Sequence, residues 1–124
     1  MKLLFLSFLF IPFLGFSQVG STCQDRINGT YHCLNEDFTN WDMQISDTLL
    51  IQVNKEFDLK ITSEIVWNSE CQFTSTIVKV IGPQQEHLLG KSTEVKITRL
   101  NPKSLAIQTE EYGELVIWNY TRKK

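Results

Sequence analysis

Apolar and polar side chains alternate along much of this chain. In the stretch 59–73, alternate positions carry apolar side chains: Leu59, Ile61, Ile65 and Trp67. Successive side chains of a β-strand point to opposite faces of a sheet, so this alternation predicts a strand with one buried face. Turn-forming residues follow at 68–70, and strand-like composition resumes at 71. The pattern predicts a central β-hairpin in which Ser63, the break in the apolar row, marks a bulge or a tightly packed position.

The same alternation recurs between turns rich in Asn, Asp, Gly and Pro. The predicted strands are 30–34, 41–46, 49–53, 59–67, 71–81, 94–100, 105–109 and 115–121. No segment shows the three- and four-residue spacing of apolar residues that is typical of a helix. Many short strands at regular spacing favour an all-β domain built as an up-and-down meander. Eight strands suffice to close an antiparallel barrel, and a β-sandwich is the alternative.

On these strands, every second side chain is predicted to face the interior. The predicted inward residues are Trp41, Met43, Ile51, Val53, Ile61, Ile65, Trp67, Val95, Ile97, Leu105 and Ile107. These residues line either a packed core or a pocket for a small apolar ligand. A domain of this size has little apolar surface to spare for an empty cavity, which favours the packed core.

The first 17 residues have the features of an export signal. Lys2 precedes an almost wholly apolar run at 3–14, and Gly15-Phe16-Ser17 fits a small-x-small cleavage site. The run is too short to span a membrane, and no second such run follows. We therefore expect an exported, periplasmic or secreted protein without a membrane span once the signal is removed. Its predicted parts are a flexible arm at 18–26, a single barrel domain at 27–121 and a basic tail at 122–124.

The three cysteines predict one disulfide in an exported protein. Cys23 lies in a polar lead-in and Cys71 lies at a strand end beside a turn, so Cys23–Cys71 is the favoured pair. Cys33 falls in mid-strand and is predicted to be a small buried apolar residue. Cys33–Cys71 is the rival pairing. No pair of cysteines has the spacing of a zinc site.

Charge and motif content argue against several functions. The net charge of −2 becomes −3 without Lys2, and the three bases Arg122-Lys123-Lys124 are predicted to form a solvated tail. A phosphate-binding surface needs a dense basic face, so a nucleic-acid partner is not expected. His32 is predicted to be exposed on a strand and His87 to lie in a loop. The sequence shows no nucleophile elbow, no phosphate loop and no metal-binding or cofactor motif, and we expect no enzyme activity.

Two short motifs carry a family resemblance. They are Cys-x₄-Asn-Gly-x-Tyr (Cys23, Asn28, Gly29 and Tyr31) and Val-Trp-x₃-Cys-x-Phe (Val66, Trp67, Cys71 and Phe73). With them the chain resembles a group of short exported proteins of Gram-negative bacteria with lipocalin-like folds. The resemblance implies a lipocalin-like barrel over most of the chain after the signal. True lipocalins bear Gly-x-Trp in their first strand, where this chain has Gly29-Thr30-Tyr31.

Two hypotheses for function follow. The first is a non-enzymatic lipocalin-like barrel that binds a small apolar molecule or serves the cell envelope. The second is a module that binds an envelope protein, such as a periplasmic protease inhibitor, because small lipocalin-like inhibitors have a similar size and plan. The arm 18–22 or the loop 82–90 would then contact the partner, since loops on a rigid scaffold often carry recognition.

Overall fold

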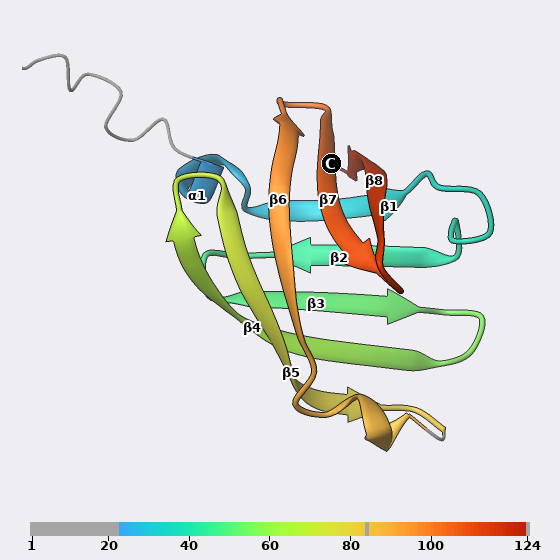
Figure 1. Cartoon of the computed structure of the whole chain (residues 1–124). Helices are drawn as coiled ribbons and strands as arrows, with labels where there is room; N and C mark the ends of the chain where they lie inside the picture. The colour runs from blue at the N-terminus through green and yellow to red at the C-terminus, as the bar shows by residue number, and fades with distance from the viewer. Residues whose placement is uncertain (1–22, 84, 124) are drawn as a thin grey trace, which may run out of the picture.

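Eight antiparallel strands form a closed barrel in chain order, as the computed structural model of residues 23–83 and 85–123 shows (Figure 1). Each strand pairs with the next, and β8 returns to pair with β1. The strands are β1 Gly29–Cys33, β2 Trp41–Ile45, β3 Leu49–Asn54, β4 Leu59–Ser69, β5 Gln72–Ile81, β6 Ser92–Leu100, β7 Ser104–Glu111 and β8 Glu114–Lys123. The predicted up-and-down barrel is confirmed. The predicted signal at 1–17 and the first part of the arm, 18–22, lie outside the described residues.

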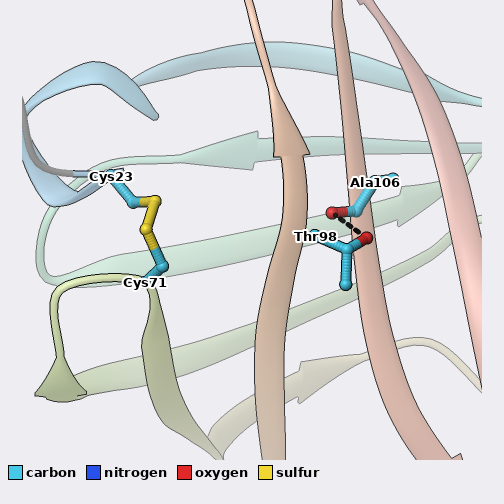
Figure 2. The surroundings of a disulfide bond; sticks show 4 residues. All are labelled: Cys23, Cys71, Thr98 and Ala106. Carbon is cyan, nitrogen blue, oxygen red and sulfur yellow. Dashed lines mark hydrogen bonds between the residues drawn. A yellow bond between two sulfur atoms is a disulfide. The ribbon is translucent and has the colours of Figure 1, made fainter.

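Three irregularities interrupt the strand pairing and help the sheet to curve, one of them between Trp67 and Ser69 beside the turn from β4 to β5. Thr62 pairs with Lys79 but Ser63 pairs with Ile77, so Val78 is an extra residue in β5. Ser63 itself is buried at this bulge, which agrees with its predicted role as a break in the apolar row. The irregularity in the β6–β7 pair leaves Thr98 between paired positions of β6, and its hydroxyl donates a hydrogen bond of 3.2 Å to the carbonyl oxygen of Ala106 (Figure 2). Bulges of this kind bend a strand and increase its twist.

The inward face of β3 differs from the prediction. Met43 faces the interior and pairs with Gln52, while Ile51 pairs with the exposed Gln44. Opposed residues of an antiparallel pair share a face, so Leu50 and Gln52 point inward. The predicted inward placement of Ile51 and Val53 is therefore wrong. A shift of one residue exchanges the two faces of a strand, and the pairing with β2 sets the phase here.

One end of the barrel is closed by the segment that precedes β1. Cys23–Arg26 forms a single helical turn, α1, rather than the predicted flexible arm. Its Cys23 is buried and forms a disulfide with Cys71, beside the turn between β4 and β5 (Figure 2). Ile27 follows with no exposed surface, and the hydroxyl of Tyr31 donates to its carbonyl oxygen at 2.7 Å. The disulfide and this hydrogen bond hold the segment over the barrel end.

The predicted basic tail is part of the same closure. Arg122 belongs to β8, and its guanidinium carbon lies 5.2 Å from the ring centroid of Tyr31. Its Nη2 donates to the carbonyl oxygen of Arg26 at 2.9 Å and also to the Tyr31 hydroxyl. Arg122 and Lys123 both belong to the last strand, so the prediction of a separate tail is wrong for both, although the Lys123 side chain is exposed as predicted. The reason is contact with β1, which lies far away in the sequence.

On the outer face of the barrel, Asp42 of β2 links its own strand to β1 and β8. Its carboxylate contacts His32 Nδ1 of β1 at 2.8 Å and Lys123 Nζ of β8 at 2.8 Å. Burial alone would raise the pKa of Asp42, but the hydrogen bonds and charges of Lys123 and His32 outweigh it and hold that pKa below its usual value. His32 lies on the outer face as predicted, and the bond to Asp42 leaves it only partly exposed.

We expect the Asp42→Asn variant to be less stable than the parent by about 1 kcal/mol at pH 7, because it loses two charge-assisted contacts. A depressed pKa in the folded state means that the carboxylate stabilises the fold above the unfolded pKa of about 4. This contribution should decrease as the pH falls through the folded-state pKa, so the two proteins should converge in acid. Urea unfolding between pH 7 and pH 2 measures this, with the exposed Glu110→Gln as control. A stability difference that does not change with pH would show that Asp42 acts through packing instead.

Candidate functional site

The interior of the barrel is packed in one half and hollow in the other. The packed half lies beside α1 and holds the most deeply buried side chains: Ile27, Tyr31, Ile45, Phe73 and Leu105. The other half contains a cavity of about 280 Å³ that is partly open to solvent. The expectation of a packed interior is therefore correct for one half only.

The open end of the cavity lies among the loops remote from α1. In an up-and-down barrel every second connection lies at the same end, which here brings together 34–40, 55–58, 82–83 with 85–91, and 112–113 (Figure 1). Phe38, from the first of these loops, places its ring edge-on to Trp118 of β8 with 5.0 Å between centroids. Phe38 and Trp41 line the cavity and also a second, more open hollow outside it. These two side chains therefore stand at the entrance.

The cavity wall is mostly apolar and is rich in aromatic side chains. The aromatic members are Phe38, Trp41, Trp118 and Tyr120. Four uncharged polar side chains are added from the strands, namely Gln52, Ser75, Thr93 and Thr109. Among the described residues that line it, only Glu111 carries a charge. A largely apolar pocket with a few polar groups is the usual form of a small-molecule site.

A chain of hydrogen bonds fixes the polar side of this wall. Trp118 Nε1 donates to Thr109 Oγ1 at 2.9 Å, and Thr109 Oγ1 donates to Glu111 Oε2 at 2.8 Å. The direction is determined because the indole nitrogen can only donate and a hydroxyl has a single proton. The carboxylate of Glu111 is thereby oriented at the cavity by a buried threonine.

Two ionisable groups in the wall are kept neutral. Burial raises the pKa of the Cys33 thiol, although a backbone hydrogen bond at Asn35 partly opposes this. Burial also raises the pKa of the Tyr120 hydroxyl well above its usual value, and the nearby Cys33 adds to the effect. Both groups are therefore protonated near pH 7. A protonated thiol is a poor nucleophile, so this part of the wall is suited to contact rather than to chemistry.

Cys33 has no disulfide partner and is almost completely buried, as the sequence predicts. We expect its thiol in the folded protein to react with 5,5′-dithiobis(2-nitrobenzoate) on the order of 100-fold more slowly than in the unfolded chain, since both burial and a raised pKa reduce the available thiolate. Absorbance at neutral pH with and without guanidinium measures the two rates. Labelling of the native protein at the rate of a free thiol would contradict the buried position.

The residues predicted to face the interior divide between the two halves. Trp41, Met43, Ile61 and Val95 line the cavity, together with Ile107. The others, apart from Ile51 and Val53, belong to the packed core: Ile65, Ile97, Leu105 and, at its edge, Trp67.

Sequence reasoning missed Thr109, Glu111 and Trp118. A signal for the first two was present, because they continue the inward parity of Leu105 and Ile107 along β7.

Residues outside the cavity offer less chemistry. In the ranges 23–83 and 85–123, no three His, Cys, Asp or Glu side chains lie together in a way that could hold a metal ion. No helix of the described part of the chain is long and apolar enough to cross a membrane. Residues 85–91 contain a short 3₁₀ turn, η3 Glu86–Leu88, and are tied to β5 by backbone hydrogen bonds between Ile77 and residues 90 and 91.

Comparison with known proteins gives no further guide, since no protein-family model, curated protein or solved structure matches the chain. The function must therefore be inferred from the barrel and its cavity.

Proposed function

We propose that this protein is a non-enzymatic, exported β-barrel that holds a small, largely apolar molecule in its open half. The cavity of about 280 Å³ is the observation that supports this proposal most strongly. Export is supported by the signal-like first 17 residues and by the disulfide between Cys23 and Cys71, a bond that persists in oxidising compartments. Membership in the exported lipocalin-like group that the chain resembles is part of the same proposal.

The size of the cavity limits the ligand. A water molecule occupies about 30 Å³ of the liquid, so the cavity has room for roughly nine waters or for one small organic molecule of similar volume. This lies at the lower end of the range of about 300–1,000 Å³ that is typical of ligand pockets. A single ring with a short side chain fits this limit better than a long fatty acid or a tetrapyrrole.

The non-enzymatic part of the proposal is supported by the chemistry of the wall. The thiol of Cys33 and the hydroxyl of Tyr120 are held in their neutral forms by burial. Glu111 has a threonine and a tryptophan as its neighbours in the hydrogen-bond chain, with no histidine in it. These groups can orient a bound molecule, but they lack the activated nucleophile and base of a catalytic constellation.

We expect n-propylbenzene, a neutral molecule of suitable size, to bind with a dissociation constant of roughly 0.1 mM, as ordinary ligand efficiencies imply. Met43 lines the cavity and Met1 is the other methionine of the chain, so ¹³C-methyl labelling of methionine provides a direct reporter. Titration should shift the Met43 methyl signal.

Two variants on neighbouring positions of β5 make this test specific. Ser75→Leu places a larger side chain in the cavity and should weaken binding at least about tenfold, since a filled cavity has no room for the ligand. Thr74→Leu changes the outer face and should leave binding unchanged, because Thr74 pairs with the exposed Val66. Equal loss of binding in both variants, or no binding by the parent at millimolar ligand, would contradict the proposed function.

A further inference from the structure

We propose that the cavity prefers a small aromatic or aliphatic amine, whose protonated amino group is bound by Glu111. This inference rests on the proposed function, and it adds the chemical class of the ligand. Three features of the wall support it: the sign of its charge, the orientation of the carboxylate and the aromatic surface around it.

The charge of the wall favours a cation. Glu111 is acidic, and no Lys, Arg or His is found among the described residues that line the cavity. A more open depression next to the cavity shares Thr93 with it and adds Glu94 and Glu110, again without a basic side chain among its described residues. The charge of Glu111 would repel an anionic ligand, whereas it would attract a cation at a site of reduced dielectric constant.

The hydrogen-bond chain leaves one side of the carboxylate for the ligand. Glu111 Oε2 accepts the proton of Thr109, which in turn accepts the indole proton of Trp118. Within residues 23–83 and 85–123, no hydrogen bond reaches Glu111 Oε1. An ammonium group has three donors and no acceptor, so it matches a carboxylate oxygen that is fixed in place and still able to accept.

The aromatic side chains near the entrance suit the same ligand. Phe38 and Trp118 meet edge to face, and Trp41 lines the same cavity. The faces of such rings attract cations, and their apolar surface packs against a hydrocarbon body. The deeper wall, with Met43 and Val95, is apolar and would receive the body of the ligand.

The test compares three probes of nearly equal size: phenethylamine, its neutral isostere n-propylbenzene, and the anion phenylacetate. Affinities for the full barrel are measured through the Met43 methyl signal. We expect phenethylamine to bind about tenfold more tightly than n-propylbenzene, as one charge-assisted hydrogen bond implies, and phenylacetate to bind more weakly than either.

Glu111→Gln keeps an acceptor for Thr109 and should abolish the preference for the amine while leaving the affinity for n-propylbenzene unchanged. Glu64→Gln is the control and should retain the preference, because Glu64 is exposed on the outer face of β4 and lines neither the cavity nor the depression beside it.

The outcomes separate this inference from the proposed function. If n-propylbenzene binds but the amine binds no better, or if the preference persists in Glu111→Gln, the amine inference is wrong and the apolar carrier remains. If none of the three probes binds, the proposed function itself is wrong.

Discussion

Replacement of both Cys23 and Cys71 by serine is expected to lower the free energy of unfolding by about 4 kcal/mol. The two residues are separated by 48 positions, and the bridge removes the corresponding loop-closure entropy from the unfolded chain. Small domains are stable by only about 5–15 kcal/mol in total, so the loss is large. The bridge also holds α1 over the packed end of the barrel, where Ile27 and Tyr31 are buried.

Urea denaturation of the double variant measures this loss. Parent protein treated with a reductant should approach the variant, because both lack the bridge. Cys33→Ala is the control that removes a thiol and keeps the disulfide, and it should change stability by about 1 kcal/mol. A double variant that differs from the parent by less than about 1 kcal/mol, instead of the roughly 4 kcal/mol expected from loop closure, would show that the bridge contributes little to stability.

The second large effect is expected for Phe73→Ala, which should cost about 3–5 kcal/mol. Phe73 is fully buried in the packed half, where its ring centroid lies 5.0 Å from the ring centroid of Trp67. The neighbouring side chains are close-packed, so they can fill only part of the space that the ring would leave. Thermal and urea unfolding both measure the loss.

The control for this prediction is Val66→Ala, on the outer face of the adjacent strand. Val66 is 64% exposed and should change stability by no more than about 0.5 kcal/mol. Equal destabilisation by the two substitutions would contradict the division into a buried inner face and a solvated outer face. A small effect of Phe73→Ala alone would indicate that the closed half is loosely packed.

The strand order could be predicted from the sequence because its signals are local. Alternation marks each strand, Asn-, Gly- and Pro-rich turns mark the connections, and short connections leave few topologies open. Which side chains of β3 point inward could not be predicted in this way. Its sequence Leu49-Leu50-Ile51-Gln52-Val53 is apolar on both faces, and only the pairing of Met43 with Gln52 selects the inward set.

The role of the chain end was hidden for a different reason. Arg122 begins a run of three bases, which is typical of a solvated tail, yet it packs over Tyr31, which lies far from it in the sequence. Such a contact depends on the closure of the barrel between β1 and β8. No local pattern within either strand records that contact.

The site was predicted in part. Met43, Ile61 and Val95 line the cavity as interior residues, and alternation alone identifies them. Glu111 was overlooked because Glu110-Glu111 stands before a turn, where acidic residues are usually solvated. Its parity with Leu105 and Ile107 was the better guide. That the interior is hollow could not be predicted, since the same apolar row fits a packed core.

The most direct test of the proposed carrier function is to determine where a small apolar molecule binds on the protein. Intermolecular nuclear Overhauser effects from n-propylbenzene to methyl-labelled protein give this position. We expect contacts to the methyl groups of Met43 and Val95, inside the cavity. Contacts only to outward methyl groups such as those of Leu115 and Ile117, or no contacts at saturating ligand, would show that the open half of the barrel is not a binding site.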